Sequence, residues 1–267
     1  MDPMIVFSIL AFAWGACAGS FANVCIHRMP RGLSVVMPRS HCTSCGRLIP
    51  GWLNIPIVSY LMLGGKCRFC RARISVRYML VELFTGQLFL AIFLKFSVSV
   101  LTLVYWLFAL GLIIGSFVDF EHMIIPDRIT IGGMVAGPIL SLLVPGLHGT
   151  VSRYSAFCSS LIGLVAGAFF LLGVAMLGSF IFKKEAMGMG DVKLLGAIGA
   201  FLGWQSIPFV ITVSSLVGSI VGISLILIGG RKLGSKMPFG PYIAIGALLW
   251  ILGGQVVWAK YVMYFSP

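Results

Sequence analysis

Long apolar runs separated by short polar segments constrain this chain more than any other feature of its sequence. Hydrophobic residues make up 59% of the chain and charged residues only 10%, which no ordinary soluble domain matches. A helix needs about 20 apolar residues to cross roughly 30 Å of hydrocarbon. We therefore expect an all-α polytopic membrane protein with about eight transmembrane helices. They are predicted at Met4–Ile26, Tyr78–Leu94, Leu101–Val118, Ile129–Val144, Ala156–Phe182, Val192–Trp204, Ile207–Ile228 and Phe239–Ala259.

The distribution of positive charge predicts how these helices are oriented. The formal net charge is +12, an excess that in a soluble protein would suggest nucleic acid as a partner. If eight helices alternate, however, sixteen of the nineteen Lys and Arg residues fall on one side of the membrane. Such a bias marks the cytoplasmic side, and it also favours contact with anionic lipid. We expect both termini outside, lipid contact, and no nucleic-acid partner.

The chain divides into a membrane bundle and one polar insert. Residues 1–26 are predicted to form the first transmembrane helix, residues 27–77 a cytoplasmic insert, and residues 78–267 the rest of the bundle. An insert of about fifty residues is too small to build a large core of its own. Something other than apolar burial must therefore stabilise it.

Four cysteines in the insert predict what that stabilising element is. Cys42 and Cys45 form one C-x-x-C knuckle, and Cys67 and Cys70 form a second, 21 residues further on. Two knuckles offer four thiolates, the ligand set of a closed tetrahedral zinc site, although this separation is just beyond the usual zinc-ribbon range. Two disulfides or reduced structural thiols are the alternatives, and a cytoplasmic location disfavours disulfides. We predict one structural zinc ion, with no open position for catalysis.

Two aspartates at the edges of apolar runs are the candidate catalytic residues. Asp119 ends the third predicted helix and Asp191 precedes the sixth. The whole chain has only seven acidic residues, and a carboxylate at the membrane edge is costly unless it has a function. Both are expected at the cytoplasmic surface, where they can meet. Two carboxylates that share one proton are able to activate water against a peptide bond.

Gly188 and Gly190 come directly before the second aspartate, in the sequence Gly-Met-Gly-Asp. Residues without a side chain let the backbone turn sharply and let an extended substrate approach it closely. We therefore expect both glycines to support substrate binding. The plainer interpretation is that Asp191 is a helix N-cap and Asp119 a satisfied helix end.

Asp127 and Lys193 are the other candidate supporting residues. Asp127 follows Pro126 at the start of the fourth predicted helix, where capping is the expected role. It is also the best alternative catalytic acid. Lys193 lies two residues after Asp191, so it either tunes that carboxylate or serves only as an orientation charge.

A series of motifs occurs in an order that is specific in combination. They are Gly19–Val24 with Arg28-Met29-Pro30, Asn54–Tyr60, the four cysteines, Arg77–Glu82, Asp119 with Ile125-Pro126-Asp127, Gly188–Lys193 and Pro238–Pro241. Together they cover nearly the whole chain. The combination resembles that of the bacterial type IV prepilin peptidases, which are bifunctional leader peptidases and N-methyltransferases of the GxGD class of intramembrane aspartic proteases.

The resemblance implies an aspartic endopeptidase of the bacterial inner membrane, with Asp119 and Asp191 as its catalytic pair. Its substrate is then a pilin-like precursor of type IV pilus assembly or protein secretion, in which a short basic leader precedes a hydrophobic helix. Cleavage occurs at the cytoplasmic face, and S-adenosylmethionine supplies a methyl group to the new N-terminal residue. One departure from the family is Thr43, where Pro is common, but the ligand cysteines remain.

The methyltransferase function rests on the resemblance alone, which associates it with the four-cysteine insert. The sequence has no strand followed by the G-x-G-x-x-G pattern of a dinucleotide-type fold. No residue is therefore predicted to bind S-adenosylmethionine.

Two other classes of function remain open to the sequence. A proton-coupled transporter would use Asp119 and Asp191 as a relay, but transporters usually hold such groups at the midplane within an internal repeat. A zinc-dependent membrane assembly factor would need the cysteines but not two matched acids. Neither the interfacial position of the aspartates nor their pairing is typical of these classes.

Overall fold

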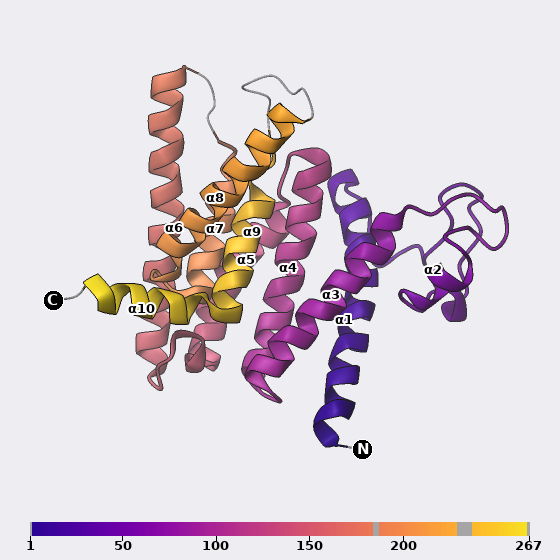
Figure 1. Cartoon of the computed structure of the whole chain (residues 1–267), viewed down its shortest axis with the longest axis horizontal. Coiled ribbons are helices and arrows are strands. Elements are labelled where there is room, and N and C mark those ends of the chain that lie inside the picture. The colour runs from indigo at the N-terminus through magenta and orange to yellow at the C-terminus, as the bar shows by residue number, and fades with distance from the viewer. Residues whose placement is uncertain (1, 184–186, 229–236, 266–267) are drawn as a thin grey trace. The chain divides into compact units, whose positions relative to one another are not determined.

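The computed structural model describes residues 2–183, 187–228 and 237–265, and it divides the chain into two compact units, residues 1–114 and 115–267. Helices dominate both units (Figure 1). The longer ones are α1 (Pro3–Arg28), α3 (Val76–Phe96), α4 (Val100–His122), α5 (Asp127–Leu143), α6 (Arg153–Phe182), α7 (Met189–Leu202), α8 (Ser206–Leu227), α9 (Gly240–Leu249) and α10 (Gln255–Phe265). The shorter ones are α2 (Val58–Met62), the 3-10 turns Met29–Arg31, Gly51–Leu53 and Pro145–His148, and the π segment Trp250–Gly254. The all-helical prediction is confirmed for these ranges.

Helices form in all eight segments that were expected to cross the membrane, but among the described residues only six stretches are long and apolar enough to do so by themselves. The two that fall short are α5, with 17 residues, and α7, with 14. At about 1.5 Å per residue, α7 reaches only about two thirds of the hydrocarbon thickness. The number eight therefore stays a prediction.

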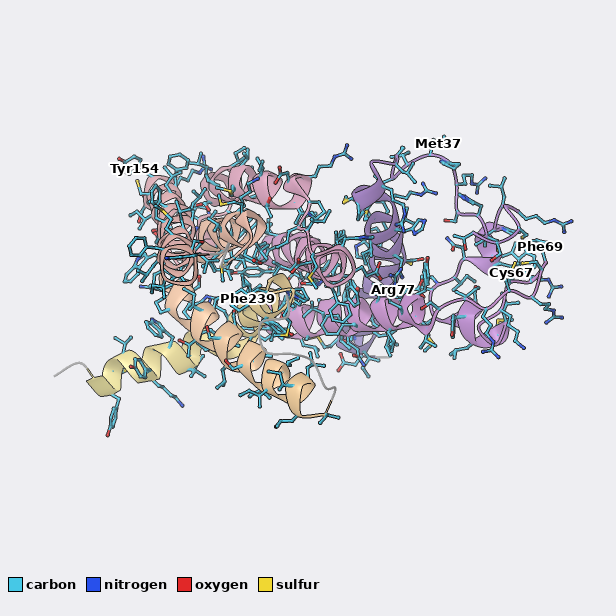
Figure 2. The ribbon with its side chains drawn as sticks, turned by 90° about the horizontal axis from the view of Figure 1, so that it is seen from above. Met37, Cys67, Phe69, Arg77, Tyr154 and Phe239 are labelled. Carbon is cyan, nitrogen blue, oxygen red and sulfur yellow. The ribbon has the colours of Figure 1, made fainter. Side chains whose placement is uncertain are left out.

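The first unit is built on close contact between α1 and α3, which lie side by side (Figure 1). A β-carbon placed on Gly15 would lie 2.7 Å from Phe89 Cβ, and one placed on Gly19 would lie 2.7 Å from Glu82 Cα. Small residues at such a crossing let two helix backbones approach closely. The insert joins the end of α1 to the start of α3 as a loop-rich region, in which Met37, Cys67 and Phe69 are labelled in Figure 2.

The second unit is organised around α7. A side chain on Gly163 of α6 would collide with the Gly199 carbonyl of α7, and one on Gly137 of α5 would lie 2.6 Å from Ala200 Cβ. Leu194 and every residue from there to Leu202 is buried, the pattern of a helix surrounded by protein. Burial on all sides also fixes the position of the Asp191 side chain in its first turn.

The last predicted span is interrupted. Phe239–Ala259 was expected as one helix, but α9 ends at Leu249, a π segment follows, and α10 runs across the direction of α9 in Figure 1. A β-carbon on Gly254 would lie 2.8 Å from the Phe209 ring. The ring therefore occupies the side of the helix where the bend occurs, and π segments are a recognised cause of such bends.

Candidate active site

Asp119 lies near the end of α4 and is 5% exposed. The helix ends three residues later because Met123 adopts a left-handed conformation (φ 56°) and Pro126 prevents a helical continuation. Asp119 Oδ2 accepts a hydrogen bond of 2.9 Å from the backbone N–H of Gly240. This bond joins the end of α4 to the first residue of α9, 121 residues away in the sequence.

Asp191 lies in the first turn of α7 and is 9% exposed. The N-cap of α7 is Gly188, so the interpretation of Asp191 as the cap residue is wrong. The backbone N–H of Gly188 donates toward the Asp191 carboxylate, whereas Oδ1 has no hydrogen-bond partner among the residues that the structure describes. An unpaired buried carboxylate oxygen costs free energy unless another group supplies a hydrogen-bond donor.

The two carboxylates face one site. The charge of Asp119 acts electrostatically on Asp191, and Ile125, in the loop after α4, contacts the elements that carry both. Its Cδ1 lies 2.9 Å from the β-carbon position of Gly240, and its Cβ lies 3.3 Å from that of Gly190. The ends of α4, α7 and α9 thus converge, and the expected meeting of the two aspartates occurs within the second unit.

The two glycines of Gly-Met-Gly-Asp do not form the sharp backbone turn that was expected of them. Gly188 has φ −74° and ψ 143°, and neither Gly188 nor Gly190 has a positive φ. Gly190 instead gives space to Ile125, which packs 3.3 Å from its β-carbon position. Close approach, rather than unusual backbone conformation, is therefore the reason for glycine at position 190.

Asp127 and Lys193 pair with each other rather than with the buried aspartates. Lys193 Nζ lies 2.7 Å from Asp127 Oδ1, and the two side chains are 33% and 62% exposed. Asp127 is the first residue of α5, whose N-cap is Pro126, so the capping role predicted for Asp127 is wrong. The ion pair joins the first residue of α5 to the fifth residue of α7. The salt-bridge partner of Lys193 in this structure is therefore Asp127 and not Asp191.

Gly240 is the functional candidate that the sequence reasoning missed. Its N–H is one of the donors that a helix start leaves without an intrahelical partner, and the positive end of the helix dipole favours a carboxylate there. The available signal was the order Gly240-Pro241 at the start of an apolar run, since Pro is favoured in the first turn of a helix. That signal predicts a helix start but does not name the carboxylate that it will meet.

The four cysteines of the insert form one cluster. Their sulfur atoms lie within 4.8 Å of one another, and Cys42 Sγ and Cys70 Sγ are 3.8 Å apart. A metal held tetrahedrally by bonds of about 2.3 Å separates its sulfur ligands by about 3.8 Å. All four thiols are free, so the disulfide alternative is wrong. The residues therefore fit a metal ion with four thiolate ligands.

Each knuckle directs backbone N–H groups at its first thiol. The N–H of Cys45 is the main cause that lowers the pKa of Cys42 to about 6. The N–H of Cys70, followed by that of Phe69, likewise lowers the pKa of Cys67. Hydrogen bonds to a sulfur atom favour its charged form, and the thiolate is the form that binds a metal.

Comparisons with known proteins confirm the resemblance. The Bacterial Peptidase A24 N-terminal domain matches residues 13–96, and the Type IV leader peptidase family matches residues 106–223. The chain is 36% identical to the prepilin leader peptidase/N-methyltransferase of Aeromonas hydrophila, over 98% of this chain and 96% of that protein. It is 34% identical to the proteins of the same name from Pseudomonas aeruginosa and Pseudomonas putida, over 97% of this chain and 95% of each relative. No solved structure matches the chain. By these matches, which extend over nearly its full length, the chain belongs to the type IV leader peptidase family.

Proposed function

We propose that this chain is a membrane-embedded aspartic endopeptidase that removes the leader from type IV prepilin-like precursors and then methylates the new N-terminal residue. The observation that carries the peptidase function is the buried pair Asp119 and Asp191, held at one site by the ends of three helices. The names of the relatives supply the prepilin substrate and the second activity.

The chemistry that we propose for cleavage needs the two carboxylates in different protonation states. Two neighbouring carboxylates cannot both ionise cheaply, so one holds a proton near neutral pH. The charged member takes a proton from water, whose oxygen attacks the scissile carbonyl carbon, while the protonated member hydrogen-bonds to the carbonyl oxygen. The C–N bond then breaks, and the leaving amine takes up the proton that the charged aspartate had removed from water. Gly240 N–H holds Asp119 in a fixed orientation throughout.

The substrate segment that is cut must be extended and accessible. Gly188 is exposed, and among the described residues beyond its two chain neighbours only Gly190 and Asp191 have atoms within 4 Å of its β-carbon position. We propose that an extended segment of the precursor passes over Gly188, with Lys193 and Asp127 at the edge of the site as supporting residues. This arrangement presents the peptide bond to the unpaired Oδ1 of Asp191.

The active site is proposed to face the cytoplasm of a bacterial inner membrane, with both termini outside. The positive-charge bias supports this orientation, and the convergence of helix ends supports eight crossings. Asp119 and Asp191 share a site, so α5 and α6 between them must together return the chain to one surface. Gly240 and Asp191 also meet at this site, because Asp119 bonds to Gly240 and faces Asp191. The helices between them, α7 and α8, must therefore also return the chain to the same surface. Since α6 and α8 are long enough to cross, we propose that α5 and α7 cross too.

Reporter fusions test this topology. A fusion after Arg73, in the insert, is expected to score as cytoplasmic, and a fusion at Gly149, between α5 and α6, is expected to score as external. The Gly149 fusion distinguishes eight crossings from six, because a chain whose α5 does not cross places that loop in the cytoplasm. A second fusion point proposed from the charge pattern, Lys184, lies outside the described residues.

We propose that the four-cysteine cluster holds a structural zinc ion. Cys42, Cys45, Cys67 and Cys70 supply the ligands, and a bound zinc ion supplies folding free energy to an insert without a large core. One zinc ion per purified chain is expected, measured by elemental analysis. The double variant Cys67→Ser, Cys70→Ser should lose it, whereas Cys17→Ser, an exposed cysteine outside the cluster, should retain it. Metal-free wild-type protein contradicts the proposal.

The methyl donor is proposed to be S-adenosylmethionine, which when bound supplies an activated methyl group. The insert, residues 27–77, is proposed as the part associated with methyl transfer, and the bundle as the peptidase. The complete function is tested by incubating the purified chain with a prepilin-like peptide and S-adenosylmethionine and reading the product masses. A mature peptide carrying one added methyl group is expected. An intact precursor after prolonged incubation contradicts the peptidase proposal.

The transporter alternative is not supported. The relatives carry the names of peptidases and methyltransferases, and the two aspartates lie at helix ends rather than in the middle of spans. A non-catalytic zinc-dependent assembly factor gives no reason for a buried carboxylate oxygen without a partner.

A further inference from the structure

The first unit contains a cavity of about 690 Å³ that the cleavage chemistry does not use. It lies between the cytoplasmic ends of α1 and α3 and the four-cysteine insert, with all of its lining residues between Ser20 and Glu82. Cys42 and Cys67 form part of its wall, so the proposed zinc ion shapes one side of it. Cavities of about 300–1,000 Å³ are typical of small-molecule and cofactor sites.

One residue of the cavity wall, Asn23, has an amide oxygen without a hydrogen-bond partner among the described residues. Asn23, on α1, is 2% exposed, and its Nδ2 donates a hydrogen bond of 2.9 Å to the Tyr78 carbonyl of α3. That bond fixes the orientation of the amide and leaves Oδ1 without a partner among the described residues. A buried acceptor of this kind is costly unless a ligand supplies a donor.

A buried carboxylate lies on the next turn of α3. Glu82 is 9% exposed and accepts a hydrogen bond of 2.8 Å from the backbone N–H of Ile57. Among the described residues that line the cavity it is the one carboxylate. Asn23 and Glu82 thus provide two acceptors, one of them able to carry a negative charge. Such a pair suits a cationic group with several N–H donors, as a primary ammonium has.

The contact between Ile57 and Glu82 is held at the cost of backbone strain. Ile57 has φ 65°, a region that a β-branched residue rarely adopts. Strain of this kind persists where the surroundings enforce it, and it clusters at ligand sites. Here the strained residue donates its N–H to the Glu82 carboxylate, which is part of the cavity wall.

The rest of the cavity wall is basic, apolar or aromatic, unlike the part formed by Asn23 and Glu82. Basic side chains, Arg68 and Arg73, line it elsewhere, and Leu53, Tyr60 and Phe69 add apolar and aromatic surface. Arg28 is already occupied, because its guanidinium donates to the carbonyls of Ser34 and Pro38. A ligand that fits this wall combines an ammonium, a carboxylate and a flat apolar ring system.

We propose that this cavity is the binding site for S-adenosylmethionine, with Glu82 and Asn23 Oδ1 holding the α-ammonium of its methionyl end. The inference rests on the proposed methyltransferase function and adds to it a site and two binding residues. The basic residues of the wall are the partners for the carboxylate of the ligand, and the apolar and aromatic surface is the partner for adenine.

Binding to the purified full-length chain, measured by titration calorimetry in detergent, tests the site. Glu82→Gln keeps the size of the side chain and an acceptor for Ile57 N–H but removes the charge. S-adenosylmethionine and S-adenosylhomocysteine, which both carry the α-ammonium, should bind roughly 10- to 100-fold more weakly. 5′-Methylthioadenosine, which lacks the methionyl end, should bind the variant and the wild type equally. Glu121→Gln, a matched change outside the cavity, should leave all three affinities unchanged.

A photoaffinity label on the adenine ring gives a second readout that does not depend on a variant. The wild-type chain, labelled with an azido-adenine analogue of S-adenosylmethionine and digested, should carry the label between residues 37 and 79. If Glu82→Gln fails to fold, judged by its thermal unfolding, the position of the label decides. Labelling in residues 115–267 overturns the site.

The outcomes separate this inference from the function on which it rests. Wild-type protein that binds S-adenosylmethionine and methylates a cleaved peptide, while Glu82→Gln binds it equally well, overturns the site and leaves the function intact. Wild-type protein that binds none of the three ligands overturns the methyltransferase proposal and the site together. Weaker binding of all three ligands to a folded Glu82→Gln variant overturns the assignment of Glu82 to the ammonium.

Discussion

Asp119→Asn and Asp191→Asn are each expected to abolish cleavage of a prepilin-like peptide. Removing a general acid or base typically costs roughly 10²- to 10⁴-fold in rate, and here each carboxylate depends on the other for its role. The change from carboxylate to amide preserves size, and Asp119 Oδ can still accept the Gly240 N–H, so the helical bundle should remain folded. Cleavage rate and thermal unfolding, measured on the same preparations, check both parts.

Asp127→Asn, unlike the two catalytic variants, is expected to keep its cleavage activity. Its side chain is 62% exposed and pairs with Lys193 at the surface, an interaction worth about 0–1 kcal/mol. Cleavage should continue, with a small loss of stability.

The two inactive variants, Asp119→Asn and Asp191→Asn, should still methylate a peptide that has already been cleaved, since methyl transfer is assigned to the other unit. Wild-type cleavage by Asp119→Asn together with an inactive Asp127→Asn would move the catalytic role to Asp127.

Gly240→Ala is expected to reduce cleavage by roughly 10²-fold, the size of effect produced by displacing a reacting group by about 1 Å. Its new β-carbon would lie 2.8 Å from Asp119 Oδ2 and 2.9 Å from Ile125 Cδ1, too close for either to stay. Both atoms end flexible side chains, so the bundle adapts at little cost in stability. The carboxylate, however, must move, and the loss should therefore appear in kcat rather than in thermal unfolding.

Gly132→Ala is the matched control for this substitution. Gly132 lies within α5, and outside the α5 backbone no described residue has an atom within 4 Å of its β-carbon position. Alanine there should leave cleavage unchanged and raise stability by up to about 1 kcal/mol through helix propensity. Equal rates for Gly240→Ala and wild type would show that the Gly240 contact does not position Asp119.

Several features of the fold follow directly from local sequence. Helices were predicted in all eight apolar segments and all eight are helical, because a chain in hydrocarbon must satisfy its backbone groups within each segment. The cysteine cluster was also predictable from the spacing of the four cysteines in the sequence. Each C-x-x-C knuckle brings its two thiols together through local backbone geometry, independently of how the rest of the chain folds. The exposed Thr43 within the first knuckle leaves that geometry intact.

Other features depend on helix faces that no local pattern specifies. That α7 is enclosed by α5 and α6 follows from contacts such as that of Gly163 with Gly199, which are formed by residues far apart in the sequence. The same reason explains why the Asp127–Lys193 pair was not foreseen. Lys193 lies two residues after Asp191 and Asp127 lies eight residues after Asp119, yet these two side chains pair with each other at the surface.

The sequence by itself determined that the chain is a helical membrane protein, which four cysteines form a cluster that could hold a metal ion, and which two aspartates to consider as a pair. Those conclusions depend on hydropathy over about 20 residues, on short spacings and on the scarcity of acids. Only the tertiary structure decided that Gly240 N–H binds Asp119, that Asp191 keeps an unpaired oxygen, and that Asn23 and Glu82 share a cavity. The physical reason is that these contacts join helix ends and faces separated by 55 residues or more, whose meeting is set by close packing of the whole unit rather than by any segment within it.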